Sequence, residues 1–279
     1  MLSDSNARLA AARGLTSPKV RRETGRFLAE GAQAVREALG RPDLVIEVFG
    51  TAAALARHAD LIDRAPAGQV SEISDRAAAG LSETVHPQGL LAVCRRLDLG
   101  LAEALSRRPR LVAMLVEAND PGNAGTILRT ADAAGADTVI LAGDSVDLYN
   151  GKLIRATAGS LFHLDLVTGP DPVEAIRQCQ AAGFLTAATS GLGSTDLDDL
   201  VDGPELARPT VWVFGNEARG LPSGLIELAD LAVRVPIHGA AESLNLSAAA
   251  ALCLYSSARA QRRGRLPDSR PGKSGEPLS

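Results

Sequence analysis

The second half of the chain alternates short, continuously apolar runs with longer segments in which apolar residues recur at helical spacing. Short apolar runs bounded by turn residues predict strands that are buried on both faces, and strands that alternate with helices pair in parallel. The sequence therefore predicts an α/β fold built on a parallel sheet with helices on both faces. The predicted strands span 111–117, 138–142, 163–167, 184–189, 210–214 and 231–235, and the predicted helices span 124–134, 152–159, 172–182 and 246–261.

The first hundred residues follow a different pattern and predict a smaller α/β unit. Residues 1–16 are basic and predict a short helix or a frayed arm. Residues 21–39 carry apolar side chains at the spacing of one helix face, which predicts a single helix. The remaining elements of this unit are predicted as strands at 44–49, 69–73 and 90–94 and a helix at 52–58.

The boundary between the two units is expected near residues 100–109, because Pro109 comes just before the first strand of the second half. We assign residues 1–105 to the first domain and residues 106–265 to the second. Residues 266–279 consist mostly of Pro, Gly, Ser and charged residues, a composition that predicts a disordered tail.

Composition and charge narrow the function classes only slightly. The 279 residues are 46% apolar and 22% charged, which is typical of a globular protein with room for two domains. No run approaches the roughly 18 apolar residues of a membrane span, and the first thirty residues lack a signal core, so we expect a cytoplasmic protein. Net charge is −4, yet residues 1–41 hold eight basic and four acidic side chains. Arginine-rich ends fit RNA binding and plain solvation equally well.

Cysteine and histidine give no sign of metal or disulfide chemistry. Cys94, Cys179 and Cys253 are widely spaced in apolar surroundings, without a Cys-x-x-Cys pair, and are predicted to be buried thiols. The four histidines are scattered, so no metal site is predicted. His163 and His238 have no obvious carboxylate partner in the sequence.

Three polar segments, at 119–131, 214–221 and 235–247, each adjoin a predicted strand or helix at its end. Ligands of an open parallel sheet bind beyond the carboxyl ends of its strands, where all three segments are expected to lie. In the first segment, Asn123 is the predicted cap of helix 124–134 and Arg129 lies off its apolar stripe. An amide and a guanidinium beside a helix N-terminus suit phosphate or ribose binding.

The other two segments add polar groups to the same edge. Gly215 and Gly220 bracket Glu217, whose carboxylate could accept from ribose or adenine groups or hold Arg129. The third segment places three polar side chains where a helix begins, and helix capping explains only one of them. These three are Ser243, Asn245 and Ser247. Together the three segments predict a ligand site. His238 lies inside the third segment and is expected to fill space there and not to take part in binding or catalysis.

Other chemistries are less well supported. Gly191 and Gly193 follow a predicted strand, but no third glycine stands at 196, which disfavours a nicotinamide-dependent dehydrogenase. The chain also lacks a Gly-x-x-x-x-Gly-Lys phosphate loop and a Gly-x-Ser-x-Gly nucleophile elbow.

The order and spacing of the three segments resemble the signature of the SpoU (TrmH-like) branch of the SPOUT RNA methyltransferases. Segments 22–31 and 86–93 in turn resemble the substrate-binding domain often found before that catalytic domain, itself similar to ribosomal protein L30e. The resemblance implies a catalytic α/β domain whose C-terminal part forms a deep trefoil knot, an exception to the usual topology rules.

The resemblance also implies a reaction: methyl transfer from S-adenosylmethionine to a ribose 2′-hydroxyl of RNA, most consistent with 23S ribosomal RNA, by a homodimer and without a metal. Transfer RNA as substrate and a non-catalytic ribosome-assembly factor are the alternatives. Whether Arg129 activates the hydroxyl as a base or anchors phosphate and hydroxyl stays open. The implied catalytic residues are Asn123, Arg129, Glu217, Ser243 and Asn245, and the implied cofactor-binding residues are Thr189, Gly215, Val235 and Leu244.

Overall fold

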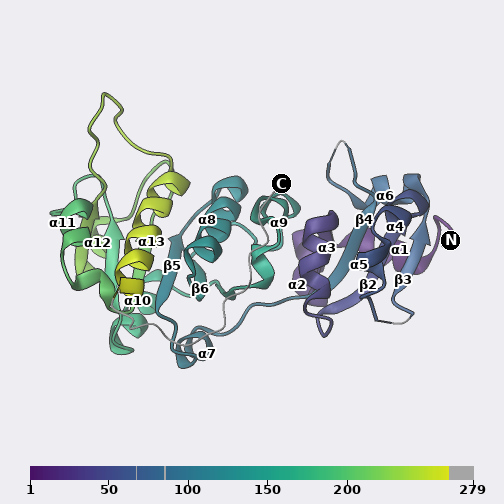
Figure 1. The fold of residues 1–279 in the computed structure, drawn as a ribbon, viewed down its shortest axis with the longest axis horizontal. Helices are drawn as coiled ribbons and strands as arrows, with labels where there is room; N and C mark the ends of the chain where they lie inside the picture. Colours follow the sequence, from purple (N-terminus) through teal and green to yellow (C-terminus); the bar gives the residue numbers. More distant parts are fainter. Residues whose placement is uncertain (67, 85, 264–279) are drawn as a thin grey trace.

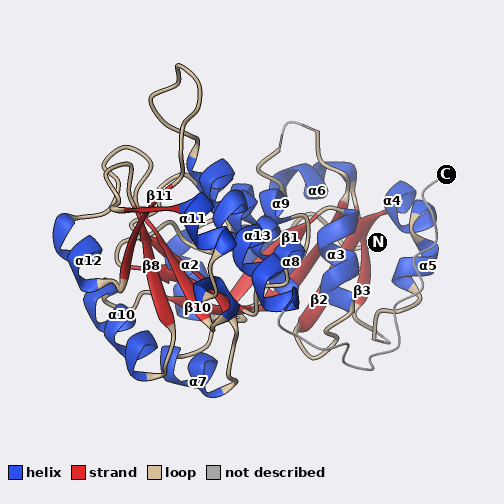
Figure 2. Ribbon diagram, turned by 60° about the vertical axis from the view of Figure 1, so that its left-hand side comes forward, coloured by secondary structure: helices blue, strands red, loops and turns tan. Residues whose placement is uncertain are grey.

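The computed structural model describes residues 1–66, 68–84 and 86–263. It contains a four-stranded sheet of order β1-β4-β2-β3 and a seven-stranded sheet of order β7-β6-β5-β10-β8-β11-β9, at opposite ends of an elongated molecule (Figures 1 and 2). Every pairing in the seven-stranded sheet is parallel, which confirms the predicted α/β fold. Within the described residues no helix has the length and apolar character of a membrane span. The predicted tail at 266–279 lies outside the described residues.

The first sheet differs from prediction at residues 21–39, which do not form one helix. Gly25 adopts a φ of 64° and ends a short helix, and Gly31 adopts a φ of 96° before the next helix begins. Between them lies a strand in which Phe27 and Ala29 are buried, paired antiparallel with β4. The elements of this unit are α1 (Ala7–Gly14), α2 (Pro18–Thr24), β1 (Arg26–Glu30), α3 (Ala32–Leu39), β2 (Val45–Thr51), α4 (Ala52–Arg57), α5 (Ala59–Ile62), β3 (Val70–Ile73), α6 (Asp75–Leu81) and β4 (Leu90–Arg95).

The second sheet contains all six predicted strands, with small shifts at their ends. The strands are β5 (Leu111–Val116), β6 (Thr138–Ala142), β7 (Asp165–Thr168), β8 (Leu185–Thr189), β9 (Thr195–Asp196), β10 (Thr210–Phe214) and β11 (Leu231–Arg234). The helices are α7 (Leu101–Ser106), α8 (Pro121–Ala134), α9 (Gly151–Thr157), α10 (Pro172–Ala181), α11 (Leu197–Asp202), α12 (Ser223–Leu228) and α13 (Leu246–Arg263). The sequence missed β9, α7, α11 and α12, each too short to carry a clear period.

Helices cover both faces of the seven-stranded sheet, as predicted. Because successive strand side chains point to opposite faces, β5 contributes to two separate cores. On one face Leu111, Ala113 and Leu115 pack in the same cluster as α8 and α13, and on the other Val112 and Met114 pack with α7, α10 and α12.

The three cysteines are buried within these cores, which confirms that prediction. Cys94, Cys179 and Cys253 are fully buried and unpaired. Burial raises the pKa of each thiol to about 12, because the thiolate loses its hydration.

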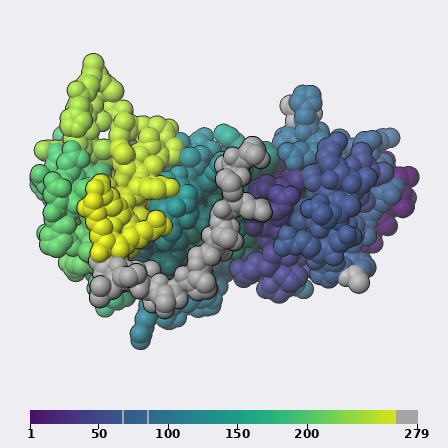
Figure 3. All heavy atoms as spheres, viewed as in Figure 1, coloured from purple at the N-terminus to yellow at the C-terminus, as the bar shows by residue number. Residues whose placement is uncertain are grey.

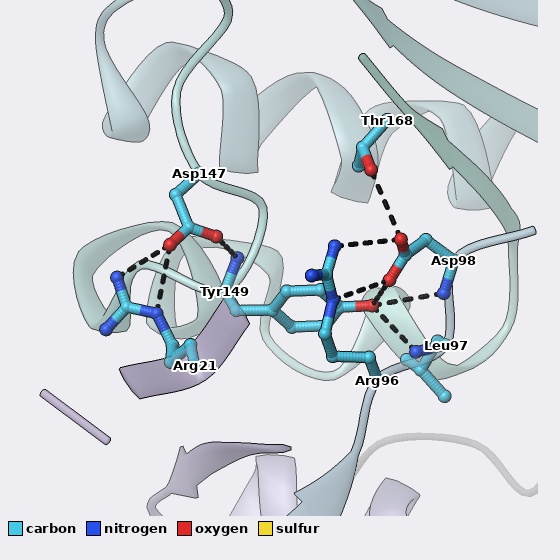
Figure 4. A network of polar contacts seen from close by, with 7 residues as sticks. All are labelled: Arg21, Arg96, Leu97, Asp98, Asp147, Tyr149 and Thr168. Atoms are coloured by element: carbon cyan, nitrogen blue, oxygen red, sulfur yellow. Dashed lines mark hydrogen bonds and ion pairs between the residues drawn. The ribbon is translucent and has the colours of Figure 1, made fainter. Parts of the chain in front are cut away.

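A partly buried polar network ties α2 and the chain between the sheets to the loop before α9 (Figure 4). Arg21, which is 3% exposed, donates through Nε and Nη2 to Asp147 Oδ2 at 3.0 and 2.8 Å. The Tyr149 hydroxyl donates to Asp98 Oδ1 at 2.6 Å and accepts from two backbone N–H groups of the linking chain. Arg96 forms a bidentate pair with the same Asp98 carboxylate. The two sheets are therefore joined by partnered charges as well as by apolar packing.

His163 forms a second junction, which corrects the prediction that it lacks a carboxylate partner. Its Nδ1 lies 2.8 Å from Asp132 of α8 and its Nε2 lies 3.1 Å from Glu37 of α3. Burial lowers the pKa of His163, but the hydrogen bonds and charges of the two carboxylates outweigh it, so the pKa is raised. Sequence could not show this contact, because the partners lie 31 and 126 residues away.

We expect the stabilisation from His163 to depend on pH. Because the folded pKa lies above the unfolded value, this stabilisation is fully present below the unfolded pKa and is lost as pH rises through the folded pKa. His163→Gln should therefore lower the free energy of unfolding most in mild acid, with a difference that shrinks toward alkaline pH. Urea unfolding of both proteins across that range measures it, with His58→Gln as control. A difference that does not vary with pH would contradict the prediction.

Candidate functional site

The carboxyl ends of four neighbouring strands meet at one edge of the seven-stranded sheet, in the order β5-β10-β8-β11. Thr189 ends β8, pairs in register with Val233 and donates through Oγ1 to the Val213 carbonyl at 3.0 Å. Gly215 follows the last residue of β10, and Val235 follows the last residue of β11. Three of the four predicted cofactor-binding residues are thus placed together by strand pairing.

The first segment begins α8 three residues earlier than predicted. Asp120 caps the helix, since its Oδ1 accepts from the Asn123 N–H at 2.7 Å, and Pro121 occupies the first helical turn. That hydrogen bond, the nearby Lys152 and the Gly122 N–H together lower the pKa of Asp120, against a smaller opposing effect of burial. The prediction that Asn123 is the cap is therefore wrong. A proline at the first helical position suits the fixed proline φ, so the helix starts there.

Asn216 connects the second segment to the end of β5, just before the first segment, by a hydrogen bond. Asn216 was not among the site residues predicted from the sequence. Asn216 is 9% exposed and donates through Nδ2 to the Glu117 carbonyl at 2.8 Å. Glu117 directly follows β5 and has a φ of 49°, a region that non-glycine residues rarely occupy and that often marks functional sites. Its carboxylate pairs with Arg219 at 3.1 Å. The signal available in sequence was an asparagine beside a glycine directly after a buried strand.

Glu217 fixes the same two segments through backbone contacts. Its carboxylate oxygens accept from the N–H groups of Asn119 and Asp120 at 3.5 and 3.4 Å. Among residues 1–66, 68–84 and 86–263, Glu217 forms no ion pair with Arg129, one of its predicted partners. Glu217 therefore lies at the predicted edge and holds the loop that starts α8.

The third segment reaches the first through Asn245. Its Oδ1 accepts from the backbone N–H of Ser247 at 2.9 Å and from the Ser247 hydroxyl at 2.5 Å, which supports the start of α13. Its Nδ2 donates to Asn123 Oδ1 at 3.1 Å. One amide thus joins the first turn of α8 to the beginning of α13, across 122 residues of sequence.

Ser243 and Leu244 lie in the loop between β11 and α13, which projects from the surface (Figures 1 and 3). Leu244 is 39% exposed and Ser243 is also exposed. His238 in the same loop lies 3.9 Å from Asp198, so it has a carboxylate partner after all, although both side chains are largely exposed. Ser243 and Leu244 are therefore not buried at the strand edge within this chain.

Arg129 lies on the exposed side of α8, six residues beyond Asn123. Six helical residues span about 9 Å along the axis. Within one chain the structure therefore gathers Asn123, Glu217 and Asn245 at a single point and leaves Arg129 further along the same helix.

The strand edge fits a ligand held by backbone groups. A Cβ added at Gly215 would lie 2.3 Å from the carbonyl carbon of Gly220, and one added at Gly193 would lie 2.6 Å from that of Val233. Backbone packs directly on backbone at both places, which only glycine permits. Such an edge can present backbone N–H and C=O groups to a ligand. Within the described part of the chain, no three His, Cys, Asp or Glu side chains gather as a metal site would require.

The parallel sheet, its glycine-built carboxyl edge and the polar loops of the three segments define a two-domain α/β protein with a candidate ligand site at the strand ends. Residues 110–255 match the SpoU rRNA Methylase family, and residues 6–92 match the MRM3-like substrate binding domain. The chain belongs to the SpoU rRNA methylase family and is a methyltransferase. The resemblance drawn from the three segments is confirmed.

Individual relatives agree with this assignment over nearly the whole chain. The chain is 34% identical to the 23S rRNA (guanosine(2553)-2′-O)-methyltransferase RlmP of Bacillus subtilis, over 91% of this chain and 96% of the relative. The crystal structure of an AdoMet-bound rRNA methyltransferase from Sinorhizobium meliloti is similar with a TM-score of 0.79 and 31% identity, covering 93% of this chain and 97% of the other. The SpoU methyltransferase AviRb from Streptomyces viridochromogenes gives a TM-score of 0.79 at 28% identity, covering 93% and 99%. The trefoil knot stays a prediction.

Proposed function

We propose that this methyltransferase modifies a ribose 2′-hydroxyl of 23S ribosomal RNA with S-adenosylmethionine as methyl donor. The observation that carries the proposal is the contact between Asn123 and Asn245, which joins two distant polar segments beside the glycine-built strand edge. The printed names of the relatives support the substrate, and the AdoMet-bound crystal structure supports the cofactor.

In this proposal the cofactor is held mainly by the backbone at Thr189, Gly215, Val235 and Leu244. S-adenosylmethionine supplies a methyl group on a positively charged sulfur. Backbone carbonyl oxygens and apolar side chains at the edge of the pocket suit this positive sulfur, because they place no second positive charge beside it. The projecting loop that carries Leu244 is proposed to close over the ligand, since Leu244 is the one exposed residue of these four.

We assign the RNA contacts to Arg129, Asn123, Glu217, Ser243 and Asn245. A guanidinium stays protonated in proteins, so Arg129 is better suited to hold a phosphate or orient the ribose hydroxyl than to accept its proton. Glu217 keeps the loop before α8 in place through its backbone contacts. The Asn123 and Asn245 amides offer hydrogen bonds that place the hydroxyl oxygen.

We also propose that the protein acts as a homodimer through α13. Leu252 and Tyr255 on this helix are 47% and 52% exposed, and Leu244 in the adjoining loop is 39% exposed. Large apolar side chains grouped on one exposed element are typical of a subunit interface. A second copy there would bring its own polar segments near Arg129, which lies apart from them within one chain.

The direct test is methyl transfer by the purified full-length protein. We expect label from methyl-tritiated S-adenosylmethionine to enter a 23S rRNA transcript and to be recovered in alkali-resistant dinucleotides, because a methylated 2′-oxygen cannot attack the neighbouring phosphate. Transfer RNA serves as the comparison substrate. Label on the bases, or transfer to tRNA alone, would contradict the proposed function.

A further inference from the structure

Two N-terminal segments marked by the family resemblance, 22–31 and 86–93, meet at one end of the four-stranded sheet. The first ends with β1 and the second enters β4, which pairs with β1. Gln88 joins them, since its Oε1 accepts from the Ala32 N–H at 3.1 Å. Gly31 has a φ of 96°, and a Cβ there would lie only 3.1 Å from the same oxygen. Glycine at this position therefore lets Gln88 reach the start of α3.

A cavity of about 240 Å³ lies between this junction and α9 of the second domain. Gln33 and Gln88 are on its N-terminal side, and Ile154, Arg155 and Ala158 are on the opposite side. None of the residues that line it belongs to the proposed catalytic or cofactor-binding set. The cavity is therefore a separate feature, built from both domains.

The α9 wall of the cavity is closely tied to the helix that carries Asn123 and Arg129. A Cβ added at Gly125 of α8 would lie 2.6 Å from the Ala156 Cβ and 2.7 Å from the Leu153 carbonyl oxygen, so the two helices are in direct backbone contact. Figure 1 shows α9 between α8 and α3. A ligand in the cavity would thus be held at a fixed place relative to α8.

The groups around the cavity match an unpaired nucleobase. Arg155 Nη1 pairs with Glu30 Oε2 at 3.1 Å, with exposed fractions of 29% and 10%, which anchors one end of its guanidinium group beside the cavity. Proteins stack unpaired RNA bases on arginine planes and read their edges with hydrogen bonds, and the Gln33 and Gln88 amides can both donate and accept. The volume falls below the roughly 300–1,000 Å³ of pockets for whole drug-sized ligands, which suits a single base.

We propose that this interdomain cavity binds one unpaired base of the RNA substrate, at a nucleotide other than the methylated one, and so contributes to substrate selection. The inference rests on the RNA substrate proposed above. Each domain forms one wall of the cavity. The way the two domains pack therefore determines the shape of the proposed base-binding site.

The proposal is tested with substitutions at Gln33, which lines the cavity and lies outside the catalytic segments. Gln33→Trp, which fills the cavity, should bind a 23S rRNA transcript about tenfold more weakly in the full-length protein, as expected for the loss of one stacked base. Gln33→Ala should weaken binding less, because it removes only an amide that reads the base edge and leaves Arg155 in place. Affinity for S-adenosylmethionine and the melting temperature should match wild type. Gln178→Trp and Gln178→Ala are matched controls, because Gln178 Nε2 donates to Glu174 four residues earlier as Gln33 Nε2 donates to Glu37 four residues later.

The outcomes separate this inference from the proposed function. RNA affinities of the Gln33 variants equal to those of the controls overturn the cavity assignment, even if wild type methylates 23S rRNA. Weakened binding by the Gln33 variants supports the cavity, even if wild type transfers no methyl group. The dependence of log Kd on log salt should be unchanged, and a shallower slope would reveal a phosphate contact and overturn the base assignment.

Discussion

Arg129→Ala should lower the rate of methyl transfer to RNA by at least about a hundredfold while leaving the affinity for S-adenosylmethionine nearly unchanged. Arg129 is exposed on α8 and lies apart from the strand edge that carries the proposed cofactor contacts. Its loss therefore removes a charged group from the RNA side of the site and disturbs no buried structure. Because the guanidinium is proposed to orient the reacting ribose, the main effect should fall on kcat.

Single-turnover methylation of a 23S rRNA transcript measures the rate, and calorimetry with S-adenosylmethionine measures the cofactor affinity. Arg177→Ala is the matched control, since Arg177 is also exposed, on α10 of the same domain. Arg129→Lys adds a further comparison, because lysine keeps the charge but loses the planar fork. Transfer by Arg129→Ala within a few-fold of wild type would refute the assigned role.

Arg21→Ala should destabilise the protein by about 3–5 kcal/mol, the usual cost of removing one partner from a buried ion pair. Arg21 is 3% exposed, donates to both Asp147 and the carbonyl oxygens of Leu15 and Thr16, and joins α2 to the second domain (Figure 4). The alanine variant leaves Asp147 Oδ2 and the two carbonyl oxygens without their donor, while Asp147 Oδ1 keeps only the Tyr149 N–H.

Urea unfolding at neutral pH measures the change. Lys19→Ala is the control, because its pair with Glu23 at 3.8 Å is exposed on both sides and should contribute less than about 1 kcal/mol. Arg21→Met combined with Asp147→Leu should recover part of the loss, since it removes both charges together. A loss for Arg21→Ala no larger than for Lys19→Ala would show that this junction does not hold the domains together.

The local hydrophobic pattern was sufficient to predict six of the seven strands of the second sheet. The strands β5, β6 and β10 are buried at every position, and they are apolar apart from a threonine at the start of β6 and of β10, so burial on both faces could be predicted from the residues alone. The start of α8 was placed three residues late, because Asp120 and Pro121 are common in turns as well as at helix N-termini.

The hydrophobic pattern was misleading at residues 21–39, where the same apolar spacing fits one long helix and also a strand between two short helices. Phe27 and Val35 are spaced for one helix face, yet Phe27 is in a strand. Gly25 adopts a positive φ where α2 ends, and Gly31 adopts one just before α3 begins. The residues between them pair with β4 and form a strand. That pairing involves residues more than sixty positions away, which no local period can indicate.

The sequence by itself determined the class of fold, the buried cysteines and the three polar segments of the site, because burial period, turn residues and motif spacing are properties of short stretches. Only the tertiary structure decided that Asn245 contacts Asn123, that Asn216 fastens the strand-end loops, and that His163 joins two domains. Each of these is a contact between side chains or loops far apart in the chain. Whether two such side chains come within hydrogen-bonding distance depends on the order of the strands in the sheet and on how the domains pack. Neither can be read from the residues that are close in sequence.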